Sequence, residues 1–347
     1  MNEKMKKNRR QFFSTVLAAP VSTALAPAMA SNKGDRFIPP GFKPGQIKLA
    51  SVSWNFGGII NSYPYDETID IIGVMGFAGI ELIIGESKDI EDYWNKESTI
   101  SHLKKKLDSY EMSVSQFVLF QNAAADLSNL NTSARNRSLD VFEEGCKIAQ
   151  KLNAPIINIV APWPREVTGP SAYLPRYFAE RSQGKKYHMD IAAGFDFAEV
   201  WETFAHTMKD CTERAAHHGL RFSLENHTHT LVHDATAFLH LWDHVKDPNL
   251  GMNLDIGWIQ LQREYPPLAI YKVKDHLINC HLRDIDSEGL VFVGIGEGVM
   301  DLKAVILALQ SIGFTGYLAF EQDGVPDMRA TIRKGKRMIE ELLRLTP

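Results

Sequence analysis

Cysteine is scarce in this chain, and the spacing of the few cysteines present indicates no disulfide framework. The 347 residues include three cysteines, Cys146, Cys211 and Cys280. An odd number with no CxxC pair excludes a disulfide scaffold. Cys146 and Cys211 fall within amphipathic helical patterns and Cys280 within an apolar run, so we expect all three to be small buried residues.

Excess positive charge and long apolar runs are also lacking. The formal net charge is -4, and five basic residues against Glu3 give the first thirty residues +4, so the remainder carries about -8. This acidity argues against a nucleic-acid partner, which needs a basic face. After the first thirty residues no segment is apolar for the ~18 residues of a membrane span. No glycine-rich phosphate cradle of recognisable spacing is present either.

The N-terminus has the pattern of an export signal. Residues 8–13 read Asn-Arg-Arg-Gln-Phe-Phe, which resembles the twin-arginine signal of bacteria, and an apolar run to Ala28 follows. We expect cleavage after Ala30, an extended lead-in over residues 31–46, and a periplasmic protein that is not inserted in the membrane. An ordinary secretory signal and a membrane anchor are the alternatives.

The rest of the chain alternates between short apolar runs and helical periodicity. One long segment, residues 164–194, has no clear period, and its aromatic content favours an ordered lid. The eight expected strands are 47–54, 79–84, 113–119, 155–160, 220–225, 250–255, 277–281 and 316–320. The eight expected helices are 66–75, 98–110, 134–152, 197–218, 235–245, 267–276, 302–312 and 328–345. This repeat predicts a single α/β domain over residues 47–347, a closed (β/α)8 TIM barrel.

Four of the expected strands end in a side chain that can bind a metal. Glu225, Asp255, His281 and Glu321 each close an apolar run. Because the carboxyl ends of barrel strands lie at one rim, we expect the four to meet there. Three carboxylates and one imidazole suit one divalent ion, Mn²⁺ foremost, with Mg²⁺, Co²⁺ and Zn²⁺ as alternatives. Taken singly, a carboxylate at a strand end can also cap a helix, and His281 can be a satisfied polar residue.

The residues around these positions resemble the metal-site motifs of the xylose isomerase-like barrels. The motifs are Leu-Glu-Asn-His at 224–227, Asn-Leu-Asp-Ile-Gly at 253–257, His-Leu-Arg-Asp at 281–284 and Phe-Glu at 320–321. That family includes ketose 3-epimerases, inosose dehydratases, sugar isomerases and apurinic endonucleases. The resemblance implies that the four residues hold one ion and that Glu225 and Glu321 are the catalytic proton-transfer pair. Such an enzyme removes a proton next to a carbonyl through a metal-stabilised enediolate.

Three positions depart from the pattern of the family's ketose epimerases. Trp258 stands where those enzymes carry a histidine, Ser287 where they carry an arginine, and Leu231 where they carry a glutamate. The substrate contacts of a free-ketose epimerase are therefore in doubt. The multi-zinc endonucleases also need the missing histidine.

Other polar and aromatic side chains are candidates for binding the substrate. Aromatic faces stack on sugar C–H faces, and Arg283 can bond a sugar oxygen or form an ion pair facing a helix. His227 shares the face of Glu225 by strand alternation. The candidates are Trp54, Trp163, Trp258, His227, Arg283 and, in the long loop, His188.

The sequence leaves three functions open. The first is a metal-dependent isomerase or epimerase acting on a non-phosphorylated carbohydrate. The second is a lyase or hydrolase that cleaves 3-keto-glycosides after the same first step. The third is a non-catalytic carbohydrate-binding barrel. All three imply a small-molecule carbohydrate or glycoside as the partner, and assembly into a homo-oligomer stays open.

Overall fold

The structure is a computed structural model, and it describes residues 47–60, 62–168, 190–228, 230–287, 291–322 and 324–345. The expected signal peptide, the lead-in, His188 and most of the expected lid lie outside these residues. Among the helices of the described part, none is long and apolar enough to cross a membrane.

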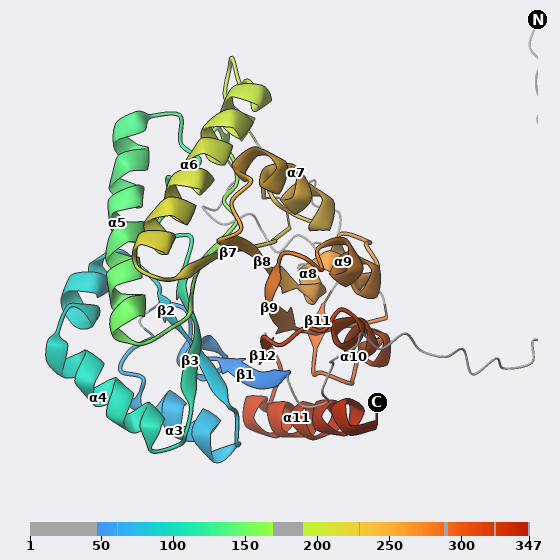
Figure 1. Cartoon of the computed structure of the whole chain (residues 1–347). Coiled ribbons are helices and arrows are strands. Elements are labelled where there is room, and N and C mark those ends of the chain that lie inside the picture. Colours follow the sequence, from blue (N-terminus) through green and yellow to red (C-terminus); the bar gives the residue numbers. More distant parts are fainter. Residues whose placement is uncertain are drawn as a thin grey trace, which may run out of the picture. The chain divides into compact units, whose positions relative to one another are not determined.

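Eight parallel strands form a closed ring, in the order β1-β12-β9-β8-β7-β4-β3-β2 (Figure 1). The first strand pairs with the last, in a register that sets Ser51 beside Phe320. The ring strands are β1 Lys48–Val52, β2 Gly79–Ile84, β3 Ser113–Leu119, β4 Ile156–Val160, β7 Arg221–Glu225, β8 Leu250–Asp255, β9 Leu277–Leu282 and β12 Tyr317–Phe320. The TIM barrel predicted from the sequence is thereby confirmed.

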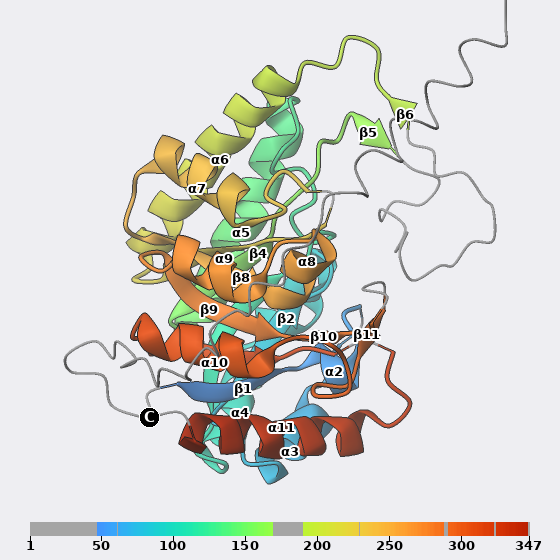
Figure 2. The ribbon, with the colours of Figure 1, turned by 90° about the vertical axis from the view of Figure 1, so that its right-hand side faces the viewer.

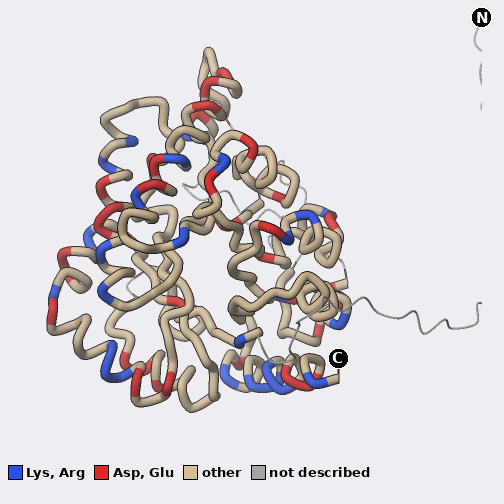
Figure 3. Tube along the Cα trace, viewed as in Figure 1, with Lys and Arg blue, Asp and Glu red and all other residues tan. Residues whose placement is uncertain are grey.

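Helices cover the outside of the ring (Figures 1 and 2). Charged residues of both signs lie along these outer helices (Figure 3), while the strands between them are almost entirely buried. Burial on both faces explains why the strands read as continuous apolar runs rather than as an alternation. The longer helices are α3 Asp66–Val74, α4 Glu97–Asp108, α5 Thr132–Lys151, α6 Phe197–His217, α7 Ala235–Val245, α9 Pro266–Lys272, α10 Leu302–Ser311 and α11 Met328–Leu345.

Several short elements were not expected from the sequence. They lie in the loops that follow strands, where local side-chain bonds and not periodicity decide the backbone. These elements are α2 Trp54–Gly57, the π-helix η1 Ile90–Trp94, α8 Ile256–Leu261, and the two-stranded pairs β5 Val167–Thr168 with β6 Asp190–Ile191 and β10 Asp284–Ile285 with β11 Phe292–Val293. The β5–β6 ribbon is the described part of the segment expected to be a lid.

Candidate metal centre

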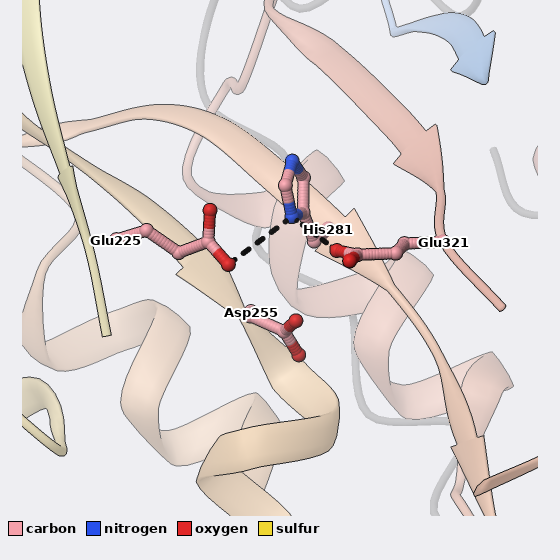
Figure 4. A group of neighbouring side chains, drawn as sticks. All are labelled: Glu225, Asp255, His281 and Glu321. Carbon is pink, nitrogen blue, oxygen red and sulfur yellow. Dashed lines mark ion pairs between the residues drawn. The ribbon is translucent and has the colours of Figure 1, made fainter. Parts of the chain in front are cut away.

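The four predicted ligands converge at the carboxyl ends of adjacent strands. Glu225 ends β7, Asp255 ends β8, His281 lies one residue before the end of β9, and Glu321 follows β12. All four are buried, and each offers one ligand atom within 4.8 Å of the others. In Figure 4 the side chains of Glu225 and Glu321 approach His281 from opposite sides, with Asp255 beside them. Register accounts for part of this convergence, because Asp255 pairs directly with His281.

Two of the carboxylates have one oxygen held by the protein and one directed at the imidazole. Asn253 Nδ2 donates to Glu225 Oε2 at 2.9 Å, and Trp54 Nε1 donates to Glu321 Oε1 at 2.8 Å. The other oxygens, Glu225 Oε1 and Glu321 Oε2, lie 3.5 and 2.7 Å from His281 Nδ1. Neither Nδ1 nor Glu321 Oε2 has a hydrogen-bond partner among the described residues, although both atoms are buried. Their alignment is therefore poor for a hydrogen bond and suitable for a shared cation.

Both carboxylate oxygens of Asp255 accept hydrogen bonds from other groups of the protein. Its Oδ1 accepts from the backbone N–H groups of Gly257 and Trp258 at 2.8 and 3.1 Å, so this residue is the N-cap of α8. Its Oδ2 accepts from Arg283 Nε at 2.7 Å. The helix-capping role considered for a strand-end carboxylate is thus real here, and Oδ2 is the oxygen that faces the other three residues' charges.

A layer of buried polar side chains lies beneath the four residues inside the ring. Successive inward positions of a strand are two residues apart, so Ser223, Asn253 and Asn279 stand one layer below Glu225, Asp255 and His281. Asn279 Nδ2 donates to Asn253 Oδ1 at 3.0 Å. Asn279 also donates to Glu81 Oε1 on β2 at 2.8 Å. Three of the four strands therefore carry a polar residue below their ligand, whereas β12 has Ala319 at this position. Asn253 reaches across to the neighbouring strand, where it donates to Glu225.

These polar residues were mostly missed in the sequence. Glu81 of β2 is one of them, and it lies below the rim, fully buried beside His281. The signal that identifies the others is a polar residue two positions before a strand-end ligand in an otherwise apolar strand. Asn253 and Asn279 both meet that description.

Burial and mutual charge shift the pKa values of the site. Burial raises the pKa of Glu225 to about 7. Burial alone would also raise the pKa of Glu321, but the charges of Arg283 and His281 and the Trp54 hydrogen bond lower it to about 2. Burial alone would lower the pKa of His281, yet the negative charges of Glu81, Glu225 and Glu321 raise it well above its usual value. The buried carboxylates therefore make the site strongly favourable for a positive charge.

Arg283 supplies part of that charge. Its guanidinium contacts Asp255 Oδ2 and Glu321 Oε1 and lies over the rings of Trp258 and Phe292, at 5.3 and 4.6 Å from their centroids. The ion pair thus faces the site and not an outer helix, which corrects one of the two alternatives drawn from the sequence. The guanidinium lies at the wall of the cavity beside the four ligands.

The remaining aromatic candidates separate into two groups. Trp54, Trp258 and His227 line the cavity beside the four ligands, and the ring of His227 lies 4.0 Å from that of Trp258. Trp163 does not line this cavity. It lines a neighbouring hollow between the β3 and β4 ends.

The donor set fits a divalent cation. Oxygen and imidazole ligands without a thiolate suit Mn²⁺, Mg²⁺, Co²⁺ or Zn²⁺. The orphaned Nδ1 of His281 and Oε2 of Glu321 are the buried atoms that such an ion would satisfy. Nε2 of His281 is meanwhile occupied by Glu81 at 2.9 Å, which is the arrangement seen around metal-binding histidines.

Comparison with solved structures gives the same fold at low sequence identity. A probable 3-DHS dehydratase, AsbF, from Bacillus anthracis matches with a TM-score of 0.65 and 16% identity, covering 85% of this chain and 99% of that one. An L-ribulose 3-epimerase matches with a TM-score of 0.65 and 16% identity, covering 86% and 95%. The 3-keto-D-glucoside 4-epimerase YcjR from E. coli matches with a TM-score of 0.64 and 14% identity, covering 85% and 99%.

A search of curated proteins found no match. The family model for the xylose isomerase-like TIM barrel matches residues 69–342, which is most of the chain and includes all four converging side chains. On that evidence the chain belongs to the xylose isomerase-like TIM barrel family.

Proposed function

We propose that the protein is a divalent-metal-dependent isomerase or epimerase that acts on a non-phosphorylated carbohydrate. The observation that carries the proposal is the convergence of Glu225, Asp255, His281 and Glu321, whose ligand atoms lie within 4.8 Å of one another in a buried site. The ion would be held by these four residues. When bound, it would supply Lewis-acid stabilisation of negative charge on the substrate's carbonyl and neighbouring hydroxyl oxygens.

Glu225 and Glu321 are the proposed proton-transfer pair. They approach the centre from opposite sides (Figure 4), which suits removal of a proton from one face of a carbon and its return to the other face or to the adjacent carbon. Burial raises the pKa of Glu225 in the metal-free protein, and a bound cation would lower that pKa toward the ionised form that a general base needs. Asn253 and Trp54 hold the two carboxylates in place through one oxygen each.

A neutral substrate is favoured by the charges around the site. The cation at the wall, Arg283, is already paired with Asp255 and Glu321. In the described part of the chain, no other Lys or Arg lines the cavity beside the four ligands. A phosphate group would need such a partner.

A lyase or hydrolase acting on 3-keto-glycosides is the second candidate. It needs the same first step, removal of the proton beside the keto group, and then expels the aglycone. Trp258 and Leu231 are both buried where the family's ketose epimerases carry a histidine and a glutamate. These replacements remove two polar contacts of a free ketose, which favours a substrate of another shape.

The experiment is proton exchange in deuterated water, with the purified protein and Mn²⁺. We expect deuterium to enter a ketose or a 3-keto-glycoside at the carbon beside the carbonyl, and Glu321→Gln and Glu225→Gln to abolish this. Release of aglycone only from 3-keto-glycosides would select the second candidate. Sugar binding without exchange, unchanged by Glu321→Gln, would contradict both and leave a binding protein.

A further inference from the structure

Two hollows adjoin at the carboxyl ends of β3 and β4. The cavity beside the four ligands has a volume of about 40 Å³, and its neighbour has about 360 Å³. Phe120, Gln121 and Val160 line both, so the two are direct neighbours. A water needs roughly 10–15 Å³ on this scale. The smaller cavity therefore has room for the reacting atoms of a ligand, and the rest of the ligand must extend into the larger one.

The larger cavity has an apolar floor. Leu119 and Ile159, at the ends of β3 and β4, and Leu127 line it and are almost completely buried. The half-buried ring of Trp163 forms another part of its wall. Its volume is more than twice the ~150 Å³ that holds benzene in an engineered cavity, and falls within the range of about 300–1,000 Å³ that is usual for ligand sites. A flat group of one or two rings fits this space.

The charged groups of the larger cavity are already paired. Arg165 Nε lies 3.2 Å from Asp126 Oδ1, and Glu86 lies 2.6 Å from Lys88. Paired charges at the rim leave no net attraction for an anionic group such as a phosphate. The cavity is thus suited to an uncharged occupant.

Gln121 stands at the junction of the two cavities with an unused acceptor. Its Nε2 donates to the backbone carbonyl of Ala161 at 3.4 Å, which fixes the amide. Its Oε1 is buried and has no hydrogen-bond partner among the described residues. A buried acceptor without a partner is costly. This position lies between the reacting end of a ligand and the part bound by the apolar floor.

We propose that the larger cavity is a subsite for an aromatic aglycone, so that the substrate is an aryl glycoside with a keto group on its sugar ring and not a free monosaccharide. This rests on the proposed function for the reacting end and extends it to the substrate class. The aromatic ring would lie between Trp163 and Leu127. The apolar floor and the Trp163 ring favour an aromatic ring there, and the polar lining residues, Glu86, Gln121, Asn122 and Arg165, stand beside it.

The test is binding of phenyl glycosides and methyl glycosides of glucose, galactose, mannose and xylose to the full chain, measured by calorimetry. We expect at least one phenyl glycoside to bind about tenfold tighter than its methyl counterpart. Ala125→Trp, which fills the cavity from its half-buried wall, and Trp163→Ala should both reduce phenyl glycoside binding to the level of the matching methyl glycoside. Ala216→Trp, on the exposed face of α6, is the matched control.

The possible outcomes test the aglycone subsite and the proposed reaction independently. Equal binding of every phenyl and methyl pair, tighter binding of cellobiose than of any phenyl glycoside, or a preference that survives both cavity variants would overturn the aglycone subsite. Because these readouts need no turnover, a phenyl preference without deuterium exchange would support the subsite while contradicting the proposed reaction. Exchange with free ketoses and no phenyl preference would do the reverse.

Discussion

Glu81 Oε2 lies 2.9 Å from His281 Nε2, with both side chains fully buried, although the two residues come from β2 and β9 on different sides of the ring. Gln116 and Asn279 donate to the same carboxylate at 3.0 and 2.8 Å. Glu81 therefore accepts three hydrogen bonds and keeps a proton on Nε2 of His281, while Nδ1 faces Glu225 and Glu321. A carboxylate in this position makes the imidazole a better ligand.

Glu81→Gln should weaken divalent-metal binding about 10- to 100-fold, the usual cost of losing such a partner. The amide would place an NH₂ group against donors, so His281 would lose its fixed orientation. Titration with Mn²⁺ in competition with a chelating dye measures the affinity, and circular dichroism reports the fold. Glu91→Gln, exposed on η1, is the control. Unchanged affinity in a folded Glu81→Gln protein would show that the contact has no part in metal binding.

Arg283→Met should destabilise the metal-free protein by about 3–5 kcal/mol, the range for breaking a buried ion pair from one side. The substitution keeps the apolar packing against Trp258 and Phe292 but leaves Asp255 and Glu321 without their cation. The free energy of unfolding in urea measures this loss. Mn²⁺ should then stabilise the variant more than the wild type, because the ion takes over the compensation. An equal gain in both proteins would contradict that coupling.

Asp255→Asn should separate the capping role of this residue from its proposed metal role. Asparagine still caps α8 by accepting from Gly257 and Trp258, but it removes one of the negative charges facing the site. In the wild type, Mn²⁺ at a hundred times its dissociation constant should raise the free energy of unfolding by about 2.7 kcal/mol, and EDTA should reverse this. The gain should nearly vanish in Asp255→Asn and persist in Asp108→Asn, on the exposed end of α4.

The Glu143 side chain should make stability fall in acid. Burial alone would raise its pKa, but the hydrogen bond from His218 at 2.6 Å and the charges of His218 and Arg214 hold the pKa below its ordinary value of 4.5. A depressed carboxyl pKa stabilises the folded state above the unfolded value, and the contribution is lost as pH falls through the folded pKa.

Glu143→Gln should therefore be less stable than the wild type at pH 7, by about 1–2 kcal/mol, and the difference should shrink below pH 4. Urea unfolding at a series of pH values gives the comparison. The neighbouring half-buried carboxylate of Glu144, which pairs with Lys147, provides the control substitution Glu144→Gln. A difference that is independent of pH would point to lost packing and not to charge.

The fold was predictable because each ring strand is buried on both faces, which produces the continuous apolar runs seen in Gly79–Ile84 and Leu250–Asp255. The placement of the four candidate ligands was predictable for a related reason. A charged residue that ends such a run can only lie at the rim, since the interior of the run would bury it unpaired.

The environment of those residues was not predictable to the same extent. Arg283 reaches Asp255 because β10 and β11 form a small hairpin that places Phe292 against it, and that hairpin has no periodic signal. Trp163 follows its strand as Trp54 and Trp258 follow theirs, yet it faces a separate cavity. A residue's position just after a strand predicts that it lies at the rim of the barrel. It does not predict the direction in which the side chain points.

The pairing of β1 with β12 sets an order of assembly. Three of the candidate ligands lie on β7, β8 and β9, and the fourth, Glu321, follows the strand that joins the last open edge to the first. A nascent chain that has not yet released β12 from the ribosome has two unpaired sheet edges and an incomplete ligand set. Ring closure and completion of the ion site are thus one event, and a cation can be captured with all four side chains only after synthesis has passed residue 321.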